Sequence, residues 1–241
     1  MVGGILKKIF CEIILILVIL FSLLSLNVYS ISSKDYTINP ISESKLNSIW
    51  SSINIKKITE DETDSILNTP ITGFDLSDNG EIVLALIDER ILIIEDDGSF
   101  VCAFDFKANG SYNVRWNKDN NIELFLTRGF IIIEFTTDGE LVSIKSIVEN
   151  VDNQETWRLM QKEREVAYND KVLSVENHLG PLNLLTFQSY TQLVLTGVDG
   201  HNNVLYDAGI YVVLRSLLII SFVFIWLFVF GSYFIYVCKK K

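Results

Sequence analysis

Apolar residues follow two different patterns along this chain. Unbroken apolar runs lie near both ends, and between them short apolar stretches alternate with polar turns. The 23 residues from Ser216 to Cys238 carry no charged side chain. As a helix they would extend about 34 Å, enough to cross the roughly 30 Å hydrocarbon core of a bilayer. We therefore expect a transmembrane helix over residues 210–238, followed by a cytoplasmic tail, residues 239–241, of three lysines.

The first apolar run has two interpretations. Lys7 and Lys8 precede it, and a Val-Tyr-Ser sequence at its end resembles the cleavage site of a signal peptide. The run also holds 18 consecutive uncharged residues, which is just enough to span a bilayer. We favour a retained anchor over residues 9–30 after a cytoplasmic N-terminus, residues 1–8. Glu12 would then lie at the cytoplasmic edge, where headgroups solvate its carboxylate.

The sequence pattern from Ile71 to Gly209 is typical of a β domain. Runs rich in Ile, Val, Leu and Phe are separated by turn sequences such as Asp97-Gly98 and Asp138-Gly139. Because the glycine supplies the positive φ that tight hairpins need, we predict antiparallel strands of about five to eight residues. Strands such as Ile82 to Ile87 are apolar on both faces and must therefore be covered on both sides.

An internal repeat runs through this domain. Asp97-Gly98 recurs 41 residues later as Asp138-Gly139, and the apolar positions before it recur at an offset of 40, so one residue is inserted late in the second copy. The matched positions are Leu76, Ile82, Leu84, Leu86 and Ile91 to Ile93 with Trp116, Ile122, Leu124, Leu126 and Ile131 to Ile133.

A third, degraded copy ends the domain with Thr191 to Thr196, Asp199-Gly200 and Val204 to Asp207. Its Asp-Gly pair comes 61 residues after the second, and we assign the excess to a polar insert around residues 150–169. A capped short helix is expected within that insert. Its predicted residues are Asp152, Trp157, Leu159 and Met160.

A unit of about forty residues that closes on an Asp-Gly hairpin resembles a blade of the β-propeller type found in WD40, NHL and PQQ-like repeat proteins. The resemblance covers residues 71–148 with a degraded copy at 171–207, and the Gly-His and Trp-Asp signatures are absent. It implies a mainly β, acidic repeat domain over residues 71–209. Because propellers typically close with about four to eight blades, three copies suggest a partial propeller, a sandwich-like stack, or a ring completed by other subunits.

Residues 31–70 are expected to form a juxtamembrane helix and a linker. Helical spacing of apolar residues predicts a helix over Ile41 to Ile53, capped by Ser42 or Ser44, with Leu46, Ile49, Trp50 and Ile53 on one face. That face would pack on the β domain or lie on the membrane surface. Ile55 to Pro70 is polar and predicts a loop with one edge strand.

Charge and cysteine content narrow the function. Residues 31–209 hold 29 of the 30 acidic residues and 14 of the 20 basic ones, so the exported part would repel nucleic acid and anionic headgroups. Such acidity suits a basic partner or serves solubility alone. Cys102 is the only cysteine in this part, which excludes an internal disulfide, and we interpret it as a small core residue.

Few residues offer catalytic chemistry. His178 and His201 lie in loops without a recognisable partner, and no zinc, nucleophile-elbow or phosphate-loop motif occurs. The acidic turns lack calcium-loop spacing and are explained by turn formation. These turn residues are Asp78, Asn79, Asp96, Asp97, Asp119, Asn120, Asp138 and Asp199. We therefore predict no catalytic, cofactor-binding or metal-binding residue.

The sequence favours a two-pass membrane protein with both termini cytoplasmic and a central extracytoplasmic domain that binds or scaffolds without catalysis. Its expected partners are the bilayer, through two helices, and a protein partner or further copies of itself. One alternative is an exported hydrolase that uses acidic residues, or a lyase. Another is an accessory subunit of a membrane complex, with aromatic residues of the second segment on partner helices: Phe222, Phe224, Trp226, Phe228 and Phe230.

Overall fold

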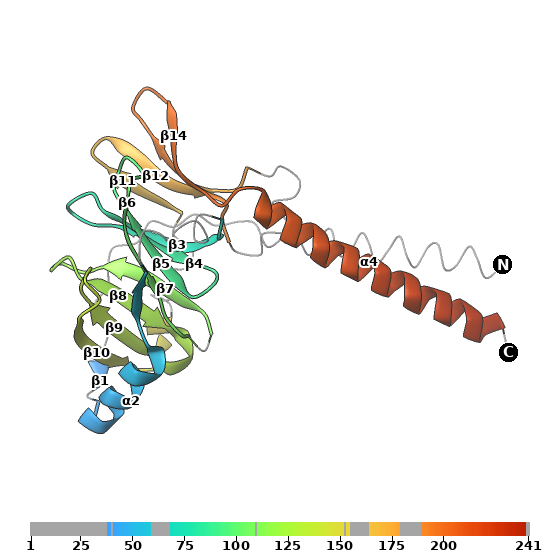
Figure 1. The fold of residues 1–241 in the computed structure, drawn as a ribbon, viewed down its shortest axis with the longest axis horizontal. Coiled ribbons are helices and arrows are strands. Elements are labelled where there is room, and N and C mark those ends of the chain that lie inside the picture. The colour runs from blue at the N-terminus through green and yellow to red at the C-terminus, as the bar shows by residue number, and fades with distance from the viewer. Residues whose placement is uncertain are drawn as a thin grey trace. The chain divides into compact units, whose positions relative to one another are not determined.

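The computed structural model describes residues 38–39, 41–58, 68–108, 110–151, 153–154, 164–178 and 189–239. These residues form three antiparallel sheets and two helices (Figure 1). The predicted N-terminal anchor over residues 9–30 lies outside this part, as do Trp157, Leu159 and Met160 of the expected short helix.

Each of the three repeats predicted from the sequence forms one sheet of four consecutive strands, which we call blades 1, 2 and 3. Blade 1 consists of β3 (Ile71–Leu76), β4 (Ile82–Leu86), β5 (Arg90–Ile94) and β6 (Phe100–Asp105). Blade 2 consists of β7 (Tyr112–Trp116), β8 (Ile122–Leu126), β9 (Ile131–Phe135) and β10 (Leu141–Ile147). Blade 3 consists of β11 (Glu165–Tyr168), β12 (Lys171–Glu176), β13 (Gln192–Thr196) and β14 (Asn202–Asp207). The prediction of antiparallel blade-type repeats is confirmed.

Two short strands from the segment before the repeats extend these sheets. β2 (Lys56–Ile58) pairs with β6 at the outer edge of blade 1, which confirms the predicted edge strand. β1 (Ile38–Asn39) pairs with β10 at the outer edge of blade 2, and the sequence gave no sign of it. The predicted linker region therefore contributes to the sheets.

Blade 1 lies between the other two blades. Val83, Ala85 and Ile93 point from one of its faces into a core shared with blade 2. Leu84 and Leu92 point from the opposite face into a core shared with blade 3. Strand β4 is buried along its whole length, as the two-sided apolar pattern predicted.

The pairing register corrects one detail of the repeat. Phe125 pairs with Ile132 in blade 2, at the place where Ala85 pairs with Ile91 in blade 1. Ile91 therefore corresponds to Ile132, and the offset is already 41 in the third strand. The extra residue lies in the connection between β8 and β9, which contains the 3-10 turn η2 (Thr127–Gly129).

The polar insert was assigned too broadly. Strand β11 and the first residue of its turn, Asn169 with positive φ, fall inside residues 150–169. The excess length instead divides between two connections, β10 to β11 and β12 to β13. Val151, Asn153 and Gln154 are helical, and the main-chain N–H of Asn153 donates to Oδ1 of Asn150 (2.7 Å).

The predicted juxtamembrane helix is α2 (Glu43–Ile53). Ser42 is its N-cap by backbone geometry, although its side chain makes no capping hydrogen bond. Ile53 is buried, and Ile49 and Trp50 are partly buried against the core between blades 1 and 2. The apolar face therefore packs on the β domain.

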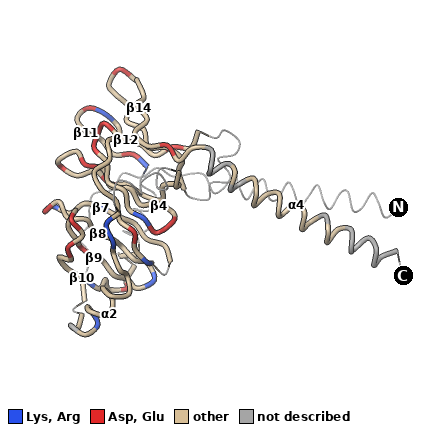
Figure 2. The backbone as a smooth tube through the Cα atoms, viewed as in Figure 1, with Lys and Arg blue, Asp and Glu red and all other residues tan. Residues whose placement is uncertain are grey.

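The hairpins between the third and fourth strands share one geometry. In blade 1 the N–H of Glu95 donates to the carbonyl of Ser99, and the N–H of Gly98 donates to the carbonyl of Glu95. The equivalent bonds recur in blades 2 and 3, with positive φ at Gly139 and Gly200. Acidic side chains occupy several of these turns (Figure 2).

Two of these hairpins dock on the neighbouring blade. A Cβ atom at Gly98 would lie 3.0 Å from the carbonyl oxygen of Leu205 in β14 of blade 3. A Cβ atom at Gly139 would lie 3.3 Å from the Phe104 ring in β6 of blade 1. A Cβ atom at Gly200 would meet no atom of the described residues within 4 Å. Each docked hairpin therefore lies on the outer strand of the adjacent blade.

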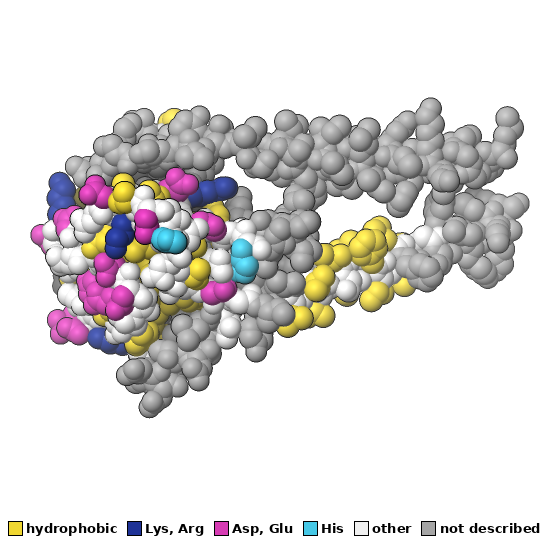
Figure 3. Space-filling view, turned by 90° about the horizontal axis from the view of Figure 1, so that it is seen from above, with side chains coloured by type: hydrophobic (Ala, Val, Ile, Leu, Met, Phe, Trp, Pro, Cys, Tyr) yellow, Lys and Arg dark blue, Asp and Glu magenta, His cyan; other side chains and the backbone are white. Residues whose placement is uncertain are grey.

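After blade 3 the chain forms α4 (Ile210–Lys239), whose described side chains are largely apolar and exposed (Figure 3). Judged on the described residues alone, which omit several side chains within α4, no helix is long and apolar enough to cross a membrane. The two predicted transmembrane segments stay predictions.

A comparison of Gly98→Ala with Gly200→Ala separates the free-energy contribution of interblade docking from the cost of backbone strain in the turn. Both residues have positive φ, so either substitution should cost about 1–2 kcal/mol of unfolding free energy from backbone strain. Gly98→Ala should cost about 1–3 kcal/mol more, because the new methyl meets the fixed main chain of Leu205. Urea denaturation measures the unfolding free energy of both variants. Equal losses of unfolding free energy would contradict the docking of the blade 1 hairpin on blade 3.

Candidate binding site on the second blade

The face of blade 2 that is turned away from blade 1 carries buried charged side chains as well as apolar ones. Alternation along β8 points Leu124 toward blade 1 and points Glu123 and Phe125 to this outer face. Glu134 and Ile132 of β9 are their cross-strand partners. The outer face therefore has a polar half built on two glutamates and an apolar half built on Phe125 and Ile132.

Glu134 is the centre of the polar half. It is 5% exposed, and its carboxylate accepts four hydrogen bonds from neighbouring side chains. Nδ2 of Asn117 and Nδ2 of Asn121 donate to Oε1 (2.6 and 3.1 Å), while Oγ of Ser143 and Nζ of Lys145 donate to Oε2 (2.8 and 3.0 Å). Burial alone would raise the pKa of Glu134, but the bonds from Lys145, Ser143 and Asn121 outweigh it and lower that pKa to about 2.

Arg115 connects the two halves of the face. Its Nε donates to Oε2 of Glu123 (2.5 Å), and its guanidinium lies 5.1 Å from the centroid of the Phe125 ring. Glu123 also lies 3.8 Å from Nζ of Lys145. The charges of two acidic and two basic side chains therefore cancel, and the hydrogen bonds among them hold the half-buried cluster rigid.

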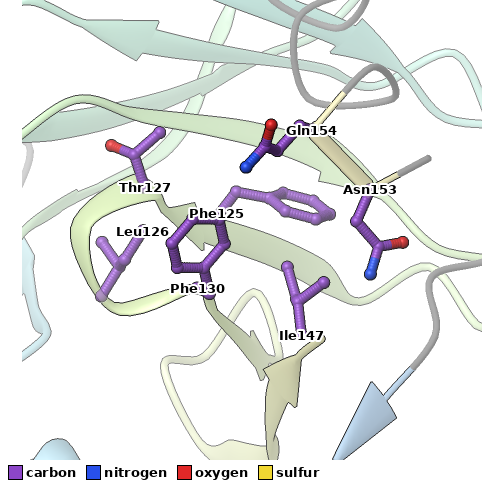
Figure 4. A pocket seen from close by; sticks show the side chains of 7 residues that line it. All are labelled: Phe125, Leu126, Thr127, Phe130, Ile147, Asn153 and Gln154. Carbon is purple, nitrogen blue, oxygen red and sulfur yellow. The ribbon is translucent and has the colours of Figure 1, made fainter. Parts of the chain in front are cut away.

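The apolar half encloses a pocket of about 290 Å³. The rings of Phe125 and Phe130 and the side chain of Ile147 converge on it, and the amides of Asn153 and Gln154 stand at its edge (Figure 4). Asn153 is buried and donates from Nδ2 to the carbonyl of Val148 (2.7 Å), which fixes that side of the pocket.

Such a pocket suits an apolar group with one polar edge. Its volume is near the lower end for small-molecule sites, so a single aromatic ring or branched apolar side chain would fill it. The exposed Gln154 amide can donate or accept a hydrogen bond at the rim. Glu134 of the polar half stays ionised near neutral pH and cannot act there as a general acid.

One carboxyl group elsewhere has a raised pKa. Asp75 in β3 is surrounded by protein at its carboxylate, and this burial raises its pKa to about 6. Its Oδ1 accepts from the N–H of Leu76 (2.9 Å) and its Oδ2 accepts from the N–H of Trp116 (2.7 Å). Because Trp116 belongs to β7, Asp75 ties the inner strands of blades 1 and 2 together and has a structural role.

The histidines and the cysteine singled out in the sequence lie apart from this face, whereas Asp119 and Asn120 lie in the turn between two of the donors to Glu134. His201 is in the hairpin of blade 3, and Nδ1 of His178 lies 3.2 Å from Oγ1 of Thr191. Cys102 is buried, and burial raises the pKa of its thiol to about 11. Within the described residues, no group of three or more His, Cys, Asp or Glu side chains could hold a metal ion.

Sequence reasoning missed the pocket and the cluster around Glu134. The one available signal was that Glu123 and Glu134 interrupt strands that are otherwise apolar on both faces. A buried carboxylate in such a strand requires partners, but the partners come from β7 and β10 and depend on register.

Glu134→Gln should lower the unfolding free energy by about 1–3 kcal/mol at pH 7, because Lys145 loses the nearer of its two carboxylate partners. The pKa of Glu134 is depressed, so its contribution is complete above about pH 4.5 and is lost as the pH falls toward 2. The difference in unfolding free energy between the wild type and the variant should therefore be smaller at pH 3 than at pH 7. Glu140→Gln, at an exposed position, is the matched control. A difference in unfolding free energy between wild type and Glu134→Gln that stays constant with pH would contradict the depressed pKa of Glu134.

No protein-family model matches the sequence, and no curated protein matches it with statistical significance. Solved structures similar to parts of the chain include a protein of unknown function from Bacteroides caccae, with 12% identity over 55% of this chain and 44% of that one, TM-score 0.27. Virginiamycin B lyase from Staphylococcus aureus, in a catalytically inactive form with quinupristin, has 12% identity over 63% of this chain and 45% of that one, TM-score 0.28. The chain thus spans less than half the length of these structures.

Proposed function

We propose that this chain is a membrane-tethered extracytoplasmic module that binds a partner through the pocket on blade 2, without catalysis. The observation that carries the proposal is the apolar pocket of about 290 Å³ bordered by amides. Phe125 lies in the hydrogen-bonded strand β8, and the carbonyl of Phe130 accepts a hydrogen bond from the N–H of Ile147 (2.6 Å), so the pocket exists before a ligand arrives and binding costs little ordering.

The apolar character of α4 supports the tether. Exposed apolar side chains are costly in water, and Leu218, Phe222 and Phe224 are 71%, 70% and 67% exposed. In lipid the same side chains would be stable, and the three terminal lysines would keep the end of the chain in the cytoplasm. The acidic β domain would then lie on the other side.

The alternatives gain less support. A hydrolase needs a carboxyl group free to exchange protons, whereas Glu134 is held by four side chains and Asp75 by two main-chain N–H groups. An accessory role in a membrane complex rests on the aromatic residues of α4, and those would serve equally well against lipid.

Cysteine labelling tests the topology. With Cys11 and Cys238 replaced by serine, Asp97→Cys in the exposed hairpin of blade 1 should react with an impermeant thiol reagent in intact cells. Lys240→Cys should react only after the membrane is opened. The retained Cys102 is buried and contributes little background. If Lys240→Cys but not Asp97→Cys were labelled in intact cells, the orientation would be the reverse of the one proposed.

Site-specific photocrosslinking tests the pocket. A benzophenone amino acid at Gln154, on the pocket rim, should give a discrete light-dependent adduct in the native membrane, resolved by electrophoresis and identified by mass spectrometry. The same amino acid at the exposed Asp78 is the control and should give none. Adducts at both positions, or at neither, would count against a binding role for the pocket.

A further inference from the structure

The three blades form an array with two different ends. The hairpin of blade 2 docks on β6 of blade 1, and the hairpin of blade 1 docks on β14 of blade 3. The spatial order is therefore 3, 1, 2, although the chain order is 1, 2, 3. Within the part of the chain that the structure describes, one end of the array offers the undocked hairpin of blade 3, and the other end offers the outer strand of blade 2 with no hairpin docked on it.

The undocked hairpin has the same form as the two docked ones. Gly197 and Gly200 make the same pair of main-chain hydrogen bonds as Thr136 and Gly139 in blade 2. Val198 occupies the position of Thr137, whose carbonyl oxygen accepts hydrogen bonds from Lys57 Nζ (3.0 Å) and from Cys102 Sγ (3.7 Å) on blade 1. Val198 itself is 81% exposed.

The receiving strand of blade 2 can be located by register. Cys102 pairs with Ile93, and the equivalent pair in blade 2 is Ser143 with Glu134. Phe104, which carries the docked hairpin on blade 1, corresponds in the same way to Lys145. Ser143 and Lys145 are partly exposed, so the equivalent docking position is accessible.

Exposed apolar side chains mark the same two ends. Among the described residues outside α4, eight large apolar side chains are exposed, and only Ile87 belongs to blade 1. The others belong to blade 3, or to blade 2 with its edge strand and the segment after it: Val172, Val198, Val204, Ile38, Leu141, Val142 and Val151. Apolar surface is thus left uncovered where further blades would continue the array.

We infer that a second copy of this chain docks at these ends, the Val198–Gly200 hairpin of each copy lying on the β10 strand of the other near Ser143 and Lys145. The contact repeats the hairpin-on-outer-strand interface that joins the blades within one copy. Because the contact is head-to-tail, two copies related by a two-fold axis make it twice and close a ring of six blades. Six lies within the usual range for closed propellers, which resolves the shortage of blades in one chain.

Most of the binding free energy would come from the apolar surface that the contact covers. The pocket of blade 2 lies in the face that would be covered, so the second copy would be the partner that the proposed function assigns to that pocket.

Disulfide crosslinking between two different variants, each with one introduced cysteine beside the buried Cys102, tests this inference. Val198→Cys and Ser143→Cys are equivalent to Thr137 and Cys102, which are in contact within one copy. In full-length chain lacking Cys11 and Cys238, mild oxidation of the mixture should yield several-fold more covalent dimer than either variant alone. Asp78→Cys mixed with Ser143→Cys is the control and should not crosslink.

The mass of the assembly and one further variant complete the test. Light scattering of the full-length chain in mild detergent should give two copies, and Val198→Glu should give one copy without a loss of thermal stability, since Val198 is exposed in a single copy. A monomeric wild type, an open filament, or crosslinking equal to that of the Asp78→Cys control would overturn the inference.

Discussion

The structure depends on one sheet that is apolar on both faces. Blade 1 cannot be exposed to water on either side, because Val83 and Ile93 cover one face and Leu84 and Leu92 cover the other. Blades 2 and 3 each bury one of these faces. This arrangement brings the last repeat beside the first.

The blade repeat was predictable because strands and Asp-Gly turns are local features. Alternation, turn chemistry and the recurrence of the Asp-Gly pair identified all three units and the two-sided burial of β4. Strand β11 was missed because its four residues, which are alternately exposed and half-buried, bury too little to stand out from a polar segment. The pairing of β1 with β10 was missed because two residues carry no periodicity.

The candidate site could not be derived from the sequence because its parts are far apart in the chain. Phe125 and Gln154 meet only after β10 has returned the chain across blade 2, and Glu134 needs donors from both flanking strands. Yet the two halves of this face belong together. The ion cluster fixes Arg115 over Phe125, and Phe125 forms a wall of the pocket, so the charges stiffen a site whose binding surface is apolar.

Native-state hydrogen exchange tests the central claim most directly. If blade 1 is covered on both faces, the amides of Val83, Leu84 and Leu92 should be the slowest to exchange, at the rate set by global unfolding. Amides of β14, at the edge of blade 3, should exchange by local opening and much faster. Equal protection of β4 and β14, or faster exchange in β4, would contradict the account.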